Sequence, residues 1–180
     1  MSAHPIPDFL EAQEVILSLL ALTTTALIDA NDWLGLTYRI LLACLVGGVI
    51  GWDRQTAGKP GGLRTHMLVS LGAALFVMIP LLTSHAASGD ALSRAVQGVA
   101  TGVGFLGAGE ILQQSSQTSG KPRIKGLTSA ATIWLTAALG MVAGCGFWQL
   151  SLGATLITLF VLSIVKQLER VVFHREDRED

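Results

Sequence analysis

The sequence predicts an all-α fold, a polytopic bundle of transmembrane helices. Hydrophobic residues make up 51% of the 180 residues and charged residues only 14%, whereas a soluble domain carries about 25% charged residues. Five apolar segments are each close to the roughly 20 residues that a helix needs to cross a bilayer. None of them alternates with period two, which favours helices over the strands of a membrane barrel.

The five predicted spans follow one another with short connections. Their charge content is very low: the first contains Arg39, the third contains Glu110, and the others contain no Asp, Glu, Lys or Arg. Together they define a predicted transmembrane core over residues 34–165. The spans cover residues 34–52, 65–82, 95–112, 126–144 and 147–165.

The N-terminal region, residues 1–33, leaves two alternatives open. Residues 9–28 are apolar and about long enough to cross a bilayer, but polar residues recur along them at helical spacing. This pattern suits an amphipathic helix in the membrane interface, or a sixth helix that packs its polar stripe against the bundle. The stripe consists of Glu11, Glu14, Ser18 and Thr25.

The distribution of lysine and arginine predicts how the bundle is oriented. Connections 53–64 and 113–125 carry three such residues each, and the tail 166–180 carries four. The opposite connections carry one, Arg94, and Arg39 joins that side if it snorkels outward. Because basic residues concentrate on the cytoplasmic side, both basic connections and the C-terminus are expected to be cytoplasmic. The tail is expected to be a charged helical extension with no soluble domain after it.

Glycine recurs four residues apart in three of the predicted spans. Small residues at this spacing let helix backbones approach closely. They predict packing within the bundle, in a homo-oligomer or against a partner helix, and a hinge beside a permeation path is the alternative. The predicted packing glycines are Gly47, Gly51, Gly98, Gly102, Gly104, Gly107, Gly109, Gly140 and Gly144.

A glycine-rich connection with several cations joins the first span to the second. Thr65 is expected to cap the second span, whose N-terminus would attract phosphate groups. Lys59 precedes Pro60 and is therefore not the lysine of a P-loop. Two interpretations stay open, a positive turn resting on anionic headgroups and a specific contact with an anion or a partner. The candidate contact residues at this face are Asp53, Arg54, Lys59, Arg64, Thr65, His66 and Lys125.

Glu110 is the acidic residue within a predicted span, and carboxylates inside a membrane are rare and often functional. It is expected to pair with a basic residue of the cytoplasmic connections, to reach water, or to serve an ion or proton site. With Asp53 and His66 it also forms a candidate metal site. Magnesium is held through water and one or two carboxylates, so weakly bound Mg²⁺ is the cofactor to consider and no other is expected.

The sequence does not indicate an enzyme. No serine or cysteine nucleophile motif accompanies His66, and Cys44 lies in the middle of a span. A net charge of −1 gives no indication of nucleic-acid binding.

Three motifs, in order and each at a membrane boundary, resemble the MgtC/SapB family of bacterial inner-membrane proteins. They are GWDRQTAGKPGGLRTHMLV at 51–69, GFLGAG at 104–109 and KGLTSAAT at 125–132. The resemblance covers roughly residues 38–165 and implies a short form without the soluble C-terminal domain of many relatives. The chain departs from the family pattern at Asp53, where Glu is common, and at Glu110, where a small or apolar residue is usual.

The resemblance implies a non-enzymatic regulator of another membrane protein, such as the F-type ATP synthase. It links the chain to magnesium limitation, ion homeostasis and a virulence-related family in the bacterial cell membrane. The alternative is a transporter or channel for magnesium or another ion. A permeation path needs rings of carbonyl or acidic groups, which here only copies of Glu110 in an oligomer would supply. The expected partners are the lipid bilayer and, through glycine-rich faces, a second copy or another membrane protein.

Overall fold

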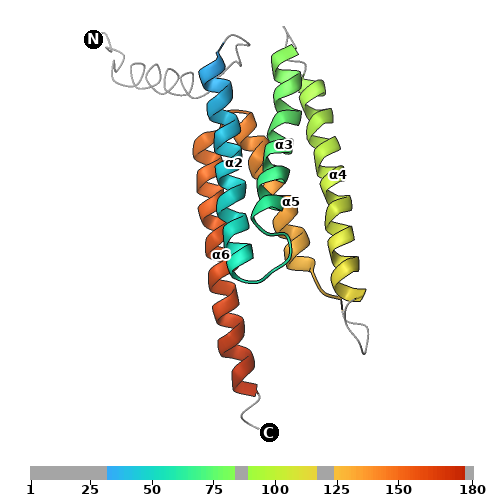
Figure 1. Ribbon diagram of the computed structural model, residues 1–180, viewed down its shortest axis with the longest axis vertical. Helices are drawn as coiled ribbons and strands as arrows, with labels where there is room; N and C mark the ends of the chain where they lie inside the picture. Colours follow the sequence, from blue (N-terminus) through green and yellow to red (C-terminus); the bar gives the residue numbers. More distant parts are fainter. Residues whose placement is uncertain (1–31, 84–88, 117–123, 177–180) are drawn as a thin grey trace, which may run out of the picture.

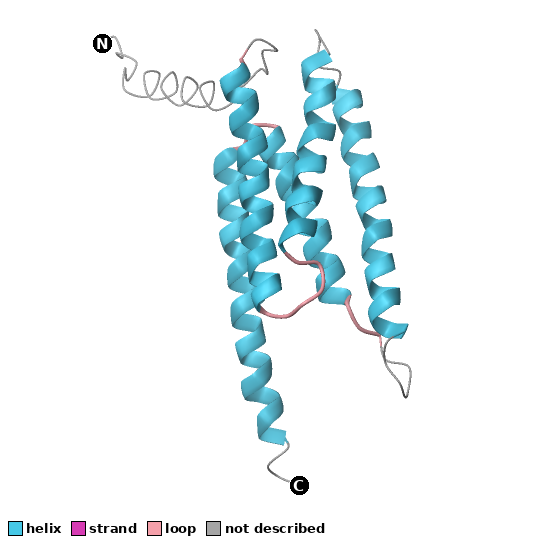
Figure 2. Cartoon of the chain, viewed as in Figure 1, coloured by secondary structure: helices cyan, strands magenta, loops and turns pink. Residues whose placement is uncertain are grey.

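The computed structural model describes residues 32–83, 89–116 and 124–176, and within these residues it is helical, without a strand (Figure 1; Figure 2). The predicted all-α membrane bundle is confirmed. Residues 9–28 lie outside the described part, so both alternatives for them stay open. The described helices are α2 (Trp33–Thr56), α3 (Leu63–Thr83), α4 (Gly89–Ser116), α5 (Leu127–Gly144) and α6 (Trp148–Glu176).

Each of the five predicted spans corresponds to one of these helices. Helices α2, α3, α4 and α5 are long and apolar enough to cross a membrane. The apolar part of α6 is shorter, Trp148–Ile164, and the helix continues through the charged sequence to Glu176. Much of the predicted C-terminal tail is therefore a continuation of the last helix.

Successive helices run in opposite directions, which gives the bundle two distinct ends (Figure 1). The connection between α2 and α3, the end of α4, the start of α5 and the end of α6 lie toward one end. The end of α3, the start of α4 and the turn between α5 and α6 lie toward the other. The lysine- and arginine-rich segments thus share one end, which we call the basic end.

Helix α3 lies between two glycine pairs, one on α2 and one on α5. A Cβ built at Gly47 would lie 2.5 Å from His66 O, and one built at Gly51 would lie 2.7 Å from Leu63 Cα. On the other side, a Cβ at Gly140 would overlap Ser70 O, and one at Gly144 would lie 2.8 Å from Ala74 O. Both pairs have the spacing that favours close backbone approach, so glycine is what brings α2, α3 and α5 together.

The centre of the bundle also contains hydroxyl side chains, and the described ones mostly donate to nearby carbonyls. Thr136 Oγ1 donates to Thr132 O at 2.8 Å, and Thr155 Oγ1 donates to Ser151 O at 2.7 Å. Ser151 Oγ reaches across from α6 to Leu139 O of α5 at 3.1 Å. These bonds satisfy polar groups that would otherwise be costly to bury.

Arg39 reaches the end of α5, which lies at the end of the bundle opposite the basic end. Its side chain is buried, 8% exposed, and its Nη1 donates to Gly144 O at 3.0 Å. That carbonyl ends α5, where a helix carries partial negative charge. Gly146, with φ +91°, completes the arrangement because a Cβ there would lie 2.8 Å from Arg39 Cζ.

Candidate functional site

The connection between α2 and α3 folds back onto the end of α2. The Lys59 N–H donates to Arg54 O at 3.0 Å, and the Leu63 N–H donates to Gln55 Oε1 at 3.2 Å. Gln55 therefore caps the start of α3. The expectation that Thr65 would do so is wrong, because α3 begins two residues earlier and Thr65 lies exposed within its first turn.

Arg54 is a buried cation at the basic end. It is 5% exposed, and its Nη2 donates to Ser129 Oγ in the first turn of α5 at 2.8 Å. Its Nε is also buried and has no hydrogen-bond partner in the described part of the chain. Ser129 was absent from the predicted contact residues, although it lies inside the KGLTSAAT motif.

His66 is fully buried where α2, α3 and α5 meet. Its Nδ1 lies 3.1 Å from Gly62 O, and its Nε2 has no partner among the described residues. A Cβ built at Gly61 would lie 3.3 Å from the ring carbon Cε1. The imidazole thus fills a tight space under the connection instead of facing the cytoplasmic surface.

Glu110 is hydrogen-bonded to an amide and interacts with the Arg54 cation through space. Its Oε1 accepts a hydrogen bond from Gln114 Nε2 at 2.7 Å, one turn further along α4. A Cβ built at Gly126, whose φ is +90°, would lie 2.8 Å from that same Nε2. The Glu110–Gln114 pair therefore lies against the start of α5.

The structure does not gather the candidate metal residues into a cluster. Over the residues it describes, no group of three or more His, Cys, Asp or Glu could hold a metal ion. Of the remaining predicted contact residues, Asp53 is half-buried, whereas Arg64 and Lys125 are exposed. The backbone N–H of Lys125 donates to Ser115 Oγ at 3.2 Å, which joins the segment before α5 to the end of α4.

A cavity of about 430 Å³ opens at the basic end beside the first turn of α5. Its wall combines cationic and polar groups with aliphatic side chains. We call it the basic-end cavity. It is lined by Arg54, Lys59, Gln114, Ile124, Gly126, Leu127, Thr128, Ser129, Val161 and Leu162.

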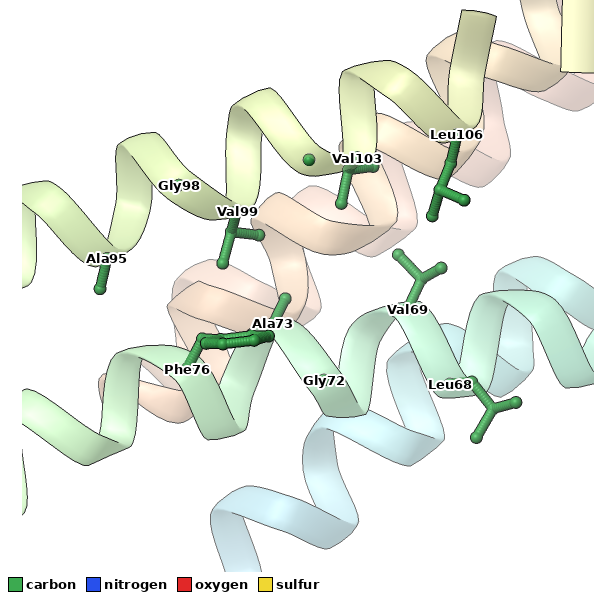
Figure 3. A pocket seen from close by; sticks show the side chains of 11 residues that line it. Leu68, Val69, Gly72, Ala73, Phe76, Ala95, Gly98, Val99, Val103 and Leu106 are labelled. Carbon is green, nitrogen blue, oxygen red and sulfur yellow. The ribbon is translucent and has the colours of Figure 1, made fainter. Parts of the chain in front are cut away.

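A second hollow, an apolar groove of about 570 Å³, runs between α3 and α4 (Figure 3). Val99 and Val103 of α4 point toward α3 across it (Figure 3). Gly98 and Gly102 line it, and a Cβ built at either would meet no atom within 4 Å. Among the described residues, it is lined by Leu68, Val69, Gly72, Ala73, Phe76, Ala95, Gly98, Val99, Gly102, Val103 and Leu106.

The glycines of α4 thus behave differently from those of α2 and α5. Gly107 contacts α5, since a Cβ there would lie 3.3 Å from Ala130 Cβ. Gly98, Gly102, Gly104 and Gly109 have open space where a side chain would be. The sequence analysis predicted helix packing at all five of these α4 glycines, but within the described chain only Gly107 packs against another helix.

Comparisons with known proteins agree with this architecture. The model of the MgtC family matches residues 40–171. The chain is 58% identical to Protein SrpB of Synechococcus elongatus over 83% of this chain and 85% of that protein. It is 43% identical to "Putative magnesium transporter YhiD" of Escherichia coli K12, over 72% of this chain and 60% of that one. No solved structure matches the chain.

A third relative is Protein MgtC of Salmonella typhimurium, 38% identical over 67% of this chain. The alignment covers 48% of that protein. The chain therefore spans most of SrpB but only about half of MgtC.

Proposed function

This chain belongs to the MgtC family, and from that premise we propose that it is a non-enzymatic regulator of another membrane protein. The regulator role is linked to magnesium limitation and ion homeostasis. An F-type ATP synthase is one membrane protein that such a regulator would act on. The protein itself is a multi-pass helical membrane protein. We further propose the bacterial inner membrane as its location, with the basic end and the C-terminus in the cytoplasm.

The open glycine pair on α4 carries this proposal. Gly47–Gly51 and Gly140–Gly144 each receive the backbone of α3, so the same spacing at Gly98–Gly102 fits a helix backbone too. The described lining of the groove there consists of aliphatic, aromatic and glycine residues, without a polar side chain. This lining supports the proposal that its occupant is a transmembrane helix of the regulated protein, with small residues at the contact.

Ion transport is the second candidate function. The name of YhiD and the membrane position of Glu110 favour it. Against it, the Glu110 carboxylate accepts a hydrogen bond from Gln114, and the described hydroxyls of the core mostly donate to backbone carbonyls. A transport role would then rest on Glu110 copies in an oligomer, since Asp53 and His66 do not gather with Glu110 in the described part of the chain.

Growth at limiting magnesium tests the regulator role with two matched variants of α4. We expect Gly102→Leu to abolish complementation of a strain lacking the gene, because the side chain fills the groove. Gly104→Leu should complement fully, since Gly104 is equally open but does not line the groove. Immunoblots must show equal protein levels, and full complementation by both variants would refute the groove as the working surface.

Ion flux separates the regulator from the transporter. The full chain is reconstituted into liposomes that contain a fluorescent Mg²⁺ indicator. We expect flux no greater than in empty liposomes, with wild type and Glu110→Gln alike. Robust flux that Glu110→Gln abolishes would replace the regulator proposal with the transporter.

A further inference from the structure

We propose that the basic-end cavity is a binding site for a phosphate group, carried by an anionic phospholipid headgroup or by free phosphate. The inference is independent of the regulator role, because it rests on a different end of the molecule. It also differs from the site expected from the sequence, which placed the anion at the start of the second span. The structure has the favourable geometry at the start of α5 instead.

The first turn of α5 supplies backbone donors. Its N-cap is Gly126, which has no side chain to bond the first N–H groups of this 18-residue helix. The Ala130 N–H bonds to Gly126 O at 2.9 Å, and the N–H groups before it lie too early for an intrahelical acceptor. Leu127, Thr128 and Ser129 all line the cavity. A helix start with free N–H groups and partial positive charge is suited to phosphate.

Arg54 provides a second and independent indication. Its guanidinium is nearly fully buried, is directed at the same helix turn by its bond to Ser129 Oγ, and has an unpartnered Nε. A cation beside a helix N-terminus is repelled by the helix dipole, so Arg39 and Arg54 have opposite electrostatic situations at the two ends of α5. A phosphate in the cavity, beside both Arg54 and the helix start, would offset that repulsion and accept from the guanidinium.

The charge around the cavity favours an anion. Lys59 lines it as a second cation, held near Arg54 by its backbone bond to Arg54 O. No carboxylate belongs to the described lining. Asp53 and Glu110 interact with Arg54 through space but lie outside the lining, and Glu110 already accepts a bond from Gln114.

The aliphatic part of the wall favours a phospholipid over free phosphate. Ile124 and Leu127 are 76% and 60% exposed, and Val161 of α6 faces the same cavity. An apolar surface next to a cationic one suits a phospholipid, whose phosphate and acyl chains need both. Free phosphate would use only the cationic side, so the two sources are separable by experiment.

Melting temperature of the full chain in detergent tests the site, because a ligand that binds only the folded state raises it. The probes are short-chain phosphatidylglycerol, short-chain phosphatidylcholine and inorganic phosphate, each titrated at about 0.15 M salt. The matched variants are Lys59→Gln and Arg64→Gln. Both residues are exposed, Lys59 on the connection and Arg64 in the first turn of α3, but of the two only Lys59 lines the cavity.

We expect Lys59→Gln to weaken the apparent affinity for the phosphate probe about fivefold or more, and Arg64→Gln to change it clearly less. A larger effect of phosphatidylglycerol than of phosphatidylcholine or inorganic phosphate assigns the site to a headgroup. An equal effect of inorganic phosphate assigns it to free phosphate. If no probe raises the melting temperature, or if the two variants behave identically, the site does not exist. Arg54→Gln is a second test of the site. If Arg54→Gln does not fold, the comparison of Lys59→Gln with Arg64→Gln still tests the proposal.

Discussion

Arg39 and Arg54 are buried arginines that both bind α5, one at each end of that helix. Arg39 Nη1 donates to the final carbonyl, Gly144 O, and Arg54 Nη2 donates to Ser129 Oγ in the first turn. Both side chains therefore act as ties between α2 and α5. From their positive charge, the sequence predicted only that these residues lie near a membrane boundary. The hydrogen-bond partner of each lies on another helix, which the charge did not indicate.

Ser129→Ala is expected to destabilise the protein by about 1–3 kcal/mol, because it leaves Arg54 Nη2 buried without its acceptor. Thr128→Ala is the matched control, since Thr128 is the exposed neighbour of Ser129 on the same turn. Thermal unfolding in detergent measures both. Equal melting temperatures for the two variants would contradict the role given to the Arg54–Ser129 bond.

At the scale of elements, α5 contacts all four of the other described helices, and α3 is the helix that the glycine pairs approach. Its two sides receive the glycine pairs of α2 and α5, and its outer face forms one wall of the groove with α4. Helix α4 has a more open position, and it contacts α5 at Gly107 and Ala130 and through the cluster of Val99 with Ala137. The consequence is a tightly packed three-helix centre with a more exposed fourth helix beside it.

Gly47→Ala tests the close approach of α2 and α3. The added methyl group would lie 2.5 Å from His66 O, and such overpacking costs about 1–3 kcal/mol. Gly104→Ala is the control on an open face, where alanine favours the helix by about 1 kcal/mol over glycine. Unfolding monitored by circular dichroism should show a lower melting temperature for the first variant and no loss for the second. A Gly47→Ala protein as stable as wild type would contradict the packing described.

At the scale of the molecule, the basic segments share one end of the bundle. The positive-inside rule turns this shared end into a prediction about sidedness, which the fold itself leaves open. Lys125 is exposed just before α5 and Asp90 is exposed in the first turn of α4, and the starts of these two helices lie at opposite ends of the bundle (Figure 1). They are the positions from which sidedness is most directly measured.

Lys125→Cys and Asp90→Cys, each in a chain with Cys44 and Cys145 replaced by alanine, should react from opposite sides of the membrane. We expect a membrane-impermeant maleimide to label Asp90→Cys in intact cells. Lys125→Cys should be labelled only after the inner membrane is opened. The reverse pattern would invert the orientation, and labelling of both from one side would contradict the number of crossings.

The sequence by itself determined the helices, their order and the end where the cations gather. Apolar length and charge position are local properties, and a bilayer acts on them directly. The sequence also placed Arg54 and Lys59 among the contact residues, and the motifs indicated the family.

Tertiary structure alone decided which glycine pairs are filled and which is open. Gly47–Gly51, Gly98–Gly102 and Gly140–Gly144 have the same spacing, so the difference comes from which helix lies opposite each pair. It likewise decided that Gln55 and not Thr65 caps α3, and that Ser129 receives Arg54. These contacts join residues that are distant in sequence or depend on how a connection folds back. The spacing of residues along the sequence does not by itself specify these contacts, because they depend on how the whole bundle packs.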